Sequence, residues 1–259
     1  MASQAQARWL LIGNTRWHWA ANQGAGWVSW HTPPLGQSLE QAHPAAPEGA
    51  AALPLAGWAA VGPVPELPAL DPAQRIGLAQ VPLRALPPWL GIDRALGGWR
   101  AWQIAQAPVL VADAGTALSF TRVDGQGCFA GGRLLAGAGL QLQALGQGTA
   151  QLPTLSPILS GAGAADLPCV QDPWPQATGA AMQSGVAWGL AAAMAEAAQQ
   201  VWQSEPACQL FLTGGDGAPL APLVEALLGP ALAGRVTVAP DLALEALALL
   251  GPPRPNQDR

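Results

Sequence analysis

The chain has 259 residues, which is enough for one large domain or for two lobes with separate cores. Half of the residues are hydrophobic and 10% are charged, which is typical of a chain that buries a core and excludes intrinsic disorder. The net charge is −5 without a basic cluster, and no apolar stretch is long enough to span a bilayer. We therefore expect a cytoplasmic protein with neither nucleic acid nor membrane as a partner. All 11 basic residues are arginines, which excludes lysine-based catalysis.

In the N-terminal part, the clearest element is a hairpin at residues 9–20. Its apolar first half meets Gly13-Asn14-Thr15, after which polar and aromatic residues alternate. Residues 26–56 are rich in Gly, Pro and Ala and give only weak signals. Residues 57–67 predict a strand that runs into a Pro-bearing loop, and residues 94–107 predict a helix that is broken by its glycines.

In the C-terminal part, residues 107–132 predict a strand, a turn, a second strand, an Asp-Gly turn and a third strand. Helical and extended segments alternate after it. They are a helix at 138–148, an irregular Pro-rich stretch at 153–177, a long helix at 179–203, a buried strand with a glycine turn at 207–217, and a strand at 235–239 between two helical stretches.

The order of these elements predicts an α/β fold with an internal duplication. Strands and helices alternate, and two similar hairpins lie 102 residues apart, with their glycines at 13 and 115. We therefore expect two lobes, at residues 1–103 and 104–250, followed by a disordered tail at 251–259.

Three glycine turns are candidates for binding phosphate. Gly13-Asn14-Thr15 and Gly115-Thr116 combine a glycine with a small hydroxyl residue, so successive backbone N–H groups can point at an anion without a lysine. The same residues are also favoured in ordinary hairpin turns. The repetition of the turn, with a third one at Gly214-Gly215 after a buried strand, favours a nucleotide clamped between two lobes.

Two acidic positions carry candidate chemistry. Asp113 ends an apolar run, where a carboxylate needs a partner, so it is either a cation ligand or a turn cap. Asp93 and Arg94 lie side by side in an apolar segment. Arg94 can bind a substrate carboxylate with its two-pronged guanidinium, and Asp93 can accept a proton from a substrate hydroxyl. The alternative is a surface pair at the start of a helix, where Asp is favoured.

The cysteines and histidines show neither disulfide nor metal-ligand spacing. We expect the cysteines to be free and to behave as small buried hydrophobic residues, and we expect no metal at the histidines. The residues are Cys128, Cys169, Cys208, His18, His31 and His43.

Several short motifs, taken in order, resemble those of the type III pantothenate kinases. They are IGNTR, GIDRA, DAGTA, GGRLLAG followed by TAQLP, TGAAMQSGV and LTGGDG. These kinases belong to the acetate/sugar kinase, heat-shock-protein and actin superfamily. The resemblance implies two duplicated lobes of ribonuclease H-like, actin-like fold with a nucleotide cleft between them, and it implies a homodimer.

The resemblance also implies an activity and a set of site residues. The activity is transfer of the ATP γ-phosphoryl group to the primary hydroxyl of pantothenate, which gives 4'-phosphopantothenate in the first step of coenzyme A synthesis. Asp93 matches the proton acceptor, and Asp113 matches the ligand of a monovalent cation, K+ or NH4+, while Mg2+ accompanies ATP. The expected pantothenate contacts are Gly91, Ile92, Asp93, Arg94 and Thr178. The expected nucleotide contacts are Gly13, Asn14, Thr15, Arg16, Gly115, Thr116, Gly214 and Gly215.

Two positions depart from the family pattern. The first motif usually reads Asp-x-Gly-Asn-Thr, but this chain has Leu11 in place of that Asp, and it has Ala136 where a Pro is common. In the superfamily the missing carboxylate helps to hold the magnesium of the nucleotide. Two hypotheses follow. The chain is an active kinase whose magnesium depends on the phosphates, water and another carboxylate, or it is a non-catalytic relative that binds nucleotide or a protein partner.

Overall fold

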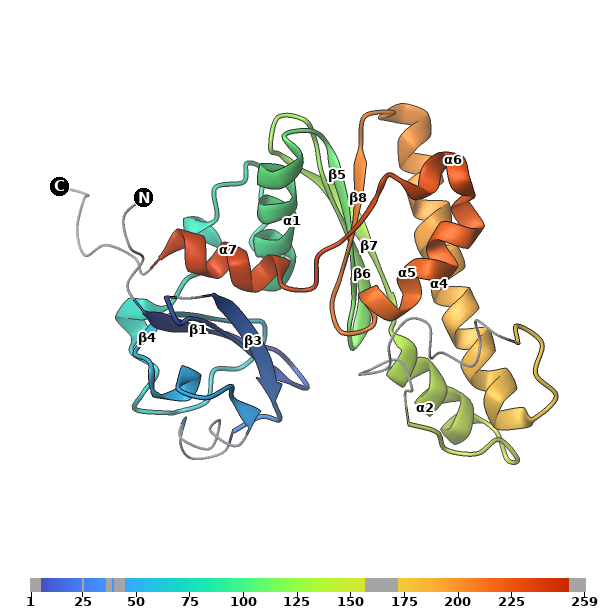
Figure 1. Ribbon diagram of the computed structural model, residues 1–259, viewed down its shortest axis with the longest axis horizontal. Coiled ribbons are helices and arrows are strands. Elements are labelled where there is room, and N and C mark those ends of the chain that lie inside the picture. Colours follow the sequence, from blue (N-terminus) through green and yellow to red (C-terminus); the bar gives the residue numbers. More distant parts are fainter. Residues whose placement is uncertain (1–5, 25, 36–38, 40–44, 157–171, 252–259) are drawn as a thin grey trace. The chain divides into compact units, whose positions relative to one another are not determined.

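The computed structural model describes residues 6–24, 26–35, 39, 45–156 and 172–251. It divides into two compact units, each built on its own sheet (Figure 1). Unit 1 holds the described residues up to Arg100 together with Asp241–Gly251, and unit 2 holds those from Ala101 to Pro240. Within these residues, no helix is both long and apolar enough to cross a membrane.

The sheet of unit 1 has the order β3-β2-β1-β4. The strands β1 (Ala7–Ile12), β2 (Trp17–Asn22) and β3 (Trp27–Thr32) form an antiparallel meander, and β4 (Leu55–Ala60) runs parallel to β1. The hairpin and the strand before the Pro-bearing loop are both present as predicted. The weak segment at 26–56 contains β3, which the sequence analysis did not identify.

Side-chain alternation gives this sheet two apolar faces. On one face, the indole rings of Trp19 and Trp30 stack with their centroids 5.9 Å apart, and Trp19 Nε1 donates to Thr32 Oγ1 at 3.2 Å. Leu10 and Ile12 of β1 belong to the same buried cluster. Since neighbouring residues of a strand face opposite sides, Leu11 points to the other face.

The sheet of unit 2 has the order β7-β6-β5-β8-β9. It repeats the pattern of unit 1, because an antiparallel meander is followed by a strand parallel to its first member. The strands are β5 (Val109–Ala114), β6 (Ala117–Val123), β7 (Phe129–Ala136), β8 (Gln209–Thr213) and β9 (Val236–Val238).

One face of this second sheet packs on helices to form the core of unit 2. Leu110 of β5 and Phe120 of β6 share a buried cluster with residues of the helices. Figure 1 shows the longest of these helices in orange beside the sheet. The helices in the cluster are α2 (Ala138–Gly148), α4 (Thr178–Ser204) and α5 (Gly217–Leu228). A short helix, α6 (Pro230–Ala233), follows α5.

The helix α1 (Ile92–Ala105) corrects the prediction of a broken helix at 94–107. It is continuous through Gly97 and Gly98, because its buried residues hold it in place on either side. Leu96 and Trp99 are both buried, and nothing lies within 4 Å of where a Cβ on Gly97 would be. A helical glycine costs about 1 kcal/mol relative to alanine, which packing of this kind offsets.

The last helix, α7 (Leu242–Leu250), lies in unit 1. The sequence had predicted it in the C-terminal lobe, at 104–250. It packs against β1, β2 and β4, and its Glu245 forms an ion pair with Arg100 of α1 at 2.8 Å. Tertiary packing rather than chain order therefore decides which unit it joins. The tail predicted at 251–259 lies outside the described residues, apart from Gly251.

Candidate functional site

The β5–β6 turn of unit 2 carries three of the predicted site residues. Asp113 is the last but one residue of β5 and pairs with Ser119 of β6 and with Thr213 of β8. The turn itself is tight, because Gly115 N donates to Ala117 O at 3.1 Å. Thr116 is the residue at its tip. The Asp113 carboxylate thus stands beside a turn made of small residues.

The glycine turn after β8 comes into contact with this first turn. Gly214 has φ +81°, which favours glycine, and a Cβ there would collide with Asp113 Oδ1 and would lie 2.6 Å from Ala114 O. Parallel pairing of β5 and β8 brings both carboxyl ends to the same edge of the sheet, so Asp113 and Gly214-Gly215 meet there.

Two further residues belong to this cluster, although the sequence analysis gave them no role. Gly137 precedes α2, donates its N–H to Thr116 O at 3.0 Å, and has no room for a side chain beside Gly115 O. Asp216 is buried, and its N–H donates to Ala114 O at 2.9 Å. The signal for Gly137 was the last glycine of GGRLLAG, directly before a helix. We call Asp113, Gly115-Thr116, Gly137, Gly214-Gly215 and Asp216 the glycine cluster.

The equivalent turn of unit 1 holds the residues Gly13–Arg16. It is one residue longer, since Gly13 N donates to Arg16 O at 3.1 Å. Val61, after β4, donates its N–H to Ile12 O at 2.9 Å, just as Asp216 does to Ala114 O in unit 2. Asn14 lies beside Gly62, where a Cβ would be 2.9 Å from Asn14 Oδ1. The two turns are therefore one device used twice, once in each sheet.

Leu11 occupies the place in unit 1 that Asp113 holds in unit 2. It lies two residues before the turn glycine and pairs with His18 of β2 and with Ala59 of β4. Leu11 is 6% exposed. Burial, with smaller contributions from His31 and Arg16, lowers the pKa of His18, while Asp241 opposes this shift. His18 is therefore predominantly neutral near pH 7, and Arg16 and Asp241 are charged groups close enough to act on it.

The predicted substrate residues begin α1. Asp93 lies in the first turn of this helix, where its Oδ1 accepts from the Arg94 backbone N–H at 2.8 Å. Gly91 passes close to this oxygen, since a Cβ there would lie 2.5 Å from Oδ1. Burial raises the pKa of Asp93, and the Arg94 backbone N–H and guanidinium offset part of that rise. A carboxylate with a raised pKa is better matched to accepting a proton near neutral pH.

The structure divides the predicted residues between the two units. Gly13–Arg16 and Gly91–Arg94 belong to unit 1, whereas Asp113, Gly115-Thr116 and Gly214-Gly215 come together in unit 2. Thr178 also lies in unit 2, as the exposed first residue of α4.

The ligands available for a metal ion are few. Nowhere in the described ranges do three or more His, Cys, Asp or Glu side chains gather as a metal site would require. Asp113 Oδ1 and Ala114 O do converge beside Gly214. One carboxylate with backbone oxygen suits a hard cation of low charge, because such ions take oxygen ligands. Of the cysteines, Cys128 and Cys208 are free, and burial raises the pKa of Cys208 to about 11, so this thiol stays protonated. Cys169 and His43 lie outside the described residues.

Comparison with known proteins places the motifs in context. Residues 75–200 match the family model described as type III pantothenate kinase. A protein of that name from Synechococcus elongatus is 37% identical over 83% of this chain and 86% of its own length. The one from Thermosynechococcus vestitus is also 37% identical, over 80% of this chain and 76% of its own length.

The fold is also found among solved structures. The ethanolamine utilization protein EutJ from Carboxydothermus hydrogenoformans superposes with a TM-score of 0.52 over 96% of this chain and 90% of its own, at 11% identity. At that identity the match concerns the fold alone. It agrees with the two similar sheets described above, and the chain has the duplicated α/β architecture of the actin-like fold.

Proposed function

This chain belongs to the type III pantothenate kinase family, and we propose that it phosphorylates pantothenate with ATP. The product is 4'-phosphopantothenate, and the reaction is the first step of coenzyme A synthesis. The observation that carries the proposal is Asp93, a half-buried acid at the start of α1 whose pKa is raised and whose neighbour is Arg94. The chemistry of this family needs a base and an anion-binding group at neighbouring positions.

The reaction assigns a separate task to each of these two residues. The Asp93 carboxylate takes the proton of the primary hydroxyl of pantothenate as that oxygen attacks the γ-phosphorus of ATP. The bond from the γ-phosphorus to the bridging oxygen breaks, and ADP leaves with the electron pair. The Arg94 guanidinium binds the carboxylate of pantothenate and holds its hydroxyl in line. Catalysis of this kind is mainly positioning and stabilisation of charge.

The phosphates are assigned to the glycine turns. Backbone N–H groups of Gly13–Arg16 and of Gly115-Thr116 can bind phosphate oxygens without a cationic side chain. Gly137 and Gly214 have no side chains and pack closely, so they present backbone atoms around the Thr116 tip. The chain has no lysine, so we propose that this backbone, the Arg16 guanidinium and the bound cations neutralise the triphosphate.

A monovalent cation, K+ or NH4+, is proposed at Asp113. The support for it is that Asp113 Oδ1 and Ala114 O both lie close to Gly214, as oxygen atoms next to the turn at Thr116. When bound, such an ion supplies positive charge beside the phosphates. Asp113 then holds the ion and orients the turn. Homodimer formation, a cytoplasmic location and a nucleotide cleft between the lobes stay predictions.

Leu11 was the reason to consider a non-catalytic relative, and nothing in the comparisons favours that alternative. The structure supports activity for another reason. Asp93, Arg94, Asp113 and Thr116 are all present, and the turn at Gly13–Arg16 keeps its hairpin geometry without the carboxylate.

The test is ADP release measured with and without pantothenate, for the wild type and for Asp93→Asn. We expect pantothenate-dependent turnover in the wild type. In the variant, activity should fall on the order of 10²- to 10⁴-fold, because a positioned base is lost, while nucleotide binding persists. Pantothenate-independent ADP release in the wild type, or a variant within a few-fold of it, would contradict this assignment.

A further inference from the structure

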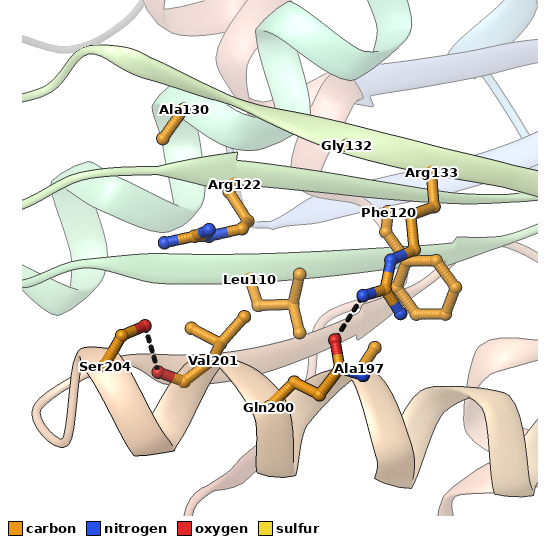
Figure 2. A pocket seen from close by; sticks show the side chains of 10 residues that line it. All are labelled: Leu110, Phe120, Arg122, Ala130, Gly132, Arg133, Ala197, Gln200, Val201 and Ser204. Atoms are coloured by element: carbon orange, nitrogen blue, oxygen red, sulfur yellow. Dashed lines mark hydrogen bonds between the residues drawn. The ribbon is translucent and has the colours of Figure 1, made fainter.

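A pocket of about 260 Å³ lies in unit 2 between the sheet and α4. Figure 2 shows Leu110 above Val201 of α4, the Phe120 ring beside Arg133, and Arg122 on the strand next to that of Arg133. An apolar floor with two cations at its side is an unusual lining for a gap in a core. None of these residues takes part in the function proposed above.

The pocket is open because of a bulge between β6 and β7. Thr121 pairs with Gly132 and Val123 with Phe129, so Ala130 and Gly131 together oppose Arg122 alone. Gly131 has φ +99°, the conformation that such a bulge requires. Ala130 and Gly132 then line the pocket on the sheet side and Ala197 lines it on α4, so none of the three has a side chain large enough to fill it.

Arg122 brings donors that the protein does not fully use. Its Nη2 pairs with Glu205 Oε2 at 2.8 Å, but among the described residues its buried Nε has no hydrogen-bond acceptor. The Nε atom itself is closed off from solvent, so an anion in the pocket can reach only the rest of this guanidinium, whose side chain is 33% exposed. A guanidinium fork of this kind matches carboxylate and phosphate oxygens.

Arg133 supplies the second cation from β7. It pairs with Glu196 at 3.0 Å and donates to Gln200, a contact that Figure 2 marks with a dashed line. Both side chains of this ion pair are 51% exposed. Exposed pairs contribute little to stability, so an anion in the pocket can replace Glu196 at low cost.

The pocket is separate from the glycine cluster. Leu110 and Asp113 lie three residues apart on β5, about 10 Å at the usual rise of a strand, and they face opposite sides of the sheet. A ligand bound at Arg122 therefore does not reach Thr116 or the nucleotide.

We propose that this pocket binds a small organic anion. Its oxyanion head, a phosphate monoester or a carboxylate, bonds to Arg122 and Arg133, and its short aliphatic part covers Leu110, Phe120 and Val201. The head is held by the charge of the two guanidinium groups, and the aliphatic part fills the space that Ala130 and Gly132 leave empty. This assignment does not rest on the kinase activity.

The experiment is calorimetric titration of the full chain, with the nucleotide turns occupied by a non-hydrolysable ATP analogue and Mg2+. The probes are butyl phosphate, valerate and inorganic phosphate, at constant ionic strength. We expect one site per chain for a probe that carries a butyl group. It should bind at least tenfold more tightly than inorganic phosphate, because each buried CH2 contributes a factor of about four. The tighter of the two butyl probes identifies the head group.

Three variants test the location of the site. Arg122→Gln and Arg133→Gln should each weaken binding about tenfold or more, through loss of a charge-assisted hydrogen bond. Ala130→Leu keeps both arginines and fills the pocket from an exposed position, so it should abolish binding without disturbing the core. The matched control is Arg100→Gln, which breaks an ion pair of the same length and similar exposure in unit 1 and should leave binding unchanged.

Two results would overturn the proposal. One is the absence of saturable binding of either butyl probe up to about 10 mM, the weakest affinity that still reports a defined site. The other is a dissociation constant that stays within twofold of the wild type in both Ala130→Leu and Arg133→Gln. These two variants decide the matter even if Arg122→Gln fails to fold.

Discussion

The β1–β2 turn of unit 1 and the β5–β6 turn of unit 2 hold the same place in their sheets but differ in polarity. In unit 2, Asp113 is flanked by Ser119 on one side and Thr213 on the other. In unit 1, Leu11 has His18 and Ala59 at those places. The order of the first four strands is the same in both sheets, and in each a backbone N–H after the parallel strand donates to the residue before the turn glycine.

This difference separates what the fold needs from what the chemistry needs. Unit 1 builds its turn with a buried leucine, so a carboxylate at this place is not required for the hairpin. In unit 2, by contrast, Asp113 is half-buried and Asp216 is buried beside a tightly packed glycine turn, where a charge is costly unless it has a partner. The cation proposed at Asp113 would be such a partner.

Asp113→Leu copies unit 1 into unit 2, and among the changes that compare the two turns it should have the largest effect on activity. We expect kcat/KM to fall on the order of 10²- to 10³-fold, as when a group that stabilises charge is removed from a site. Dependence on K+ should be lost together with activity, whereas Asp113→Asn keeps the shape and isolates the charge. Rates that are equal with and without K+ in the wild type would remove the cation from this position.

A matched pair of glycines compares the turns by stability. Gly214→Ala forces a side chain into a left-handed conformation against Asp113 Oδ1 and backbone, and we expect the free energy of unfolding to drop by about 2 to 4 kcal/mol. Gly62→Ala, in the loop that follows β4 in unit 1, meets only the end of the Asn14 side chain, and it should cost below about 1 kcal/mol. Denaturant unfolding of both variants measures the difference. Equal losses would mean that the two turns are packed alike.

Leu11→Asp makes the reverse exchange. An aspartate at a position that is 6% exposed should lower the stability of the ligand-free protein by about 1 to 3 kcal/mol, because the charge is buried. Mg-ATP should restore part of that loss, and the magnesium requirement for turnover should fall, since a carboxylate near the phosphates orients a ligand water. Thermal unfolding with and without Mg-ATP gives the first readout and a magnesium titration of activity gives the second. If the variant and the wild type share the same stabilisation by Mg-ATP and the same magnesium requirement, Leu11 does not face the nucleotide.

Asp93→Asn should show the smallest effect on stability, and the effect should depend on pH. Burial raises the pKa of Asp93, so the folded state disfavours its charged form. The stability that this acid contributes is fully present below its unfolded pKa of about 4 and is lost as the pH rises through the folded value. The asparagine variant should therefore match the wild type near pH 3.5 and become the more stable of the two toward pH 7. A stability difference that does not vary over this range would mean that Asp93 is not desolvated.

The sequence predicted most of the elements, and the failures have physical causes. Residues 138–148 were predicted correctly because apolar residues at helical spacing mark one face of a helix. The helix at 94–107 was predicted as broken because glycine lowers local propensity, whereas burial of Leu96 and Trp99 decides the outcome. The strand β3 was missed because its segment is rich in Gly, Pro and Ala. The location of α7 depends on contacts between distant parts of the chain, which no local pattern records.

The candidate site was predicted in part for similar reasons. The motifs identified the glycine turns and Asp113, since close approach of backbone to a ligand requires small residues at fixed places. The packing of Gly137 against Gly115 was not predicted, because it depends on how β7 turns into α2. The arginine pocket was not predicted either. It depends on a bulge opposite Arg122, and a one-residue slip in register leaves no mark in the hydrophobic pattern.

The return of α7 to unit 1 bears on how the protein is made. A ribosome delivers unit 2 as one uninterrupted segment, from Ala101 to Pro240, before it delivers the helix that unit 1 needs. Until Leu242–Leu250 have emerged, the face of β1 that carries Leu11 lacks the helix that packs against it. Unit 2 thus has every described element it needs while one apolar face of the unit 1 sheet is still uncovered. The half of the protein that is begun first is therefore the half that is completed last.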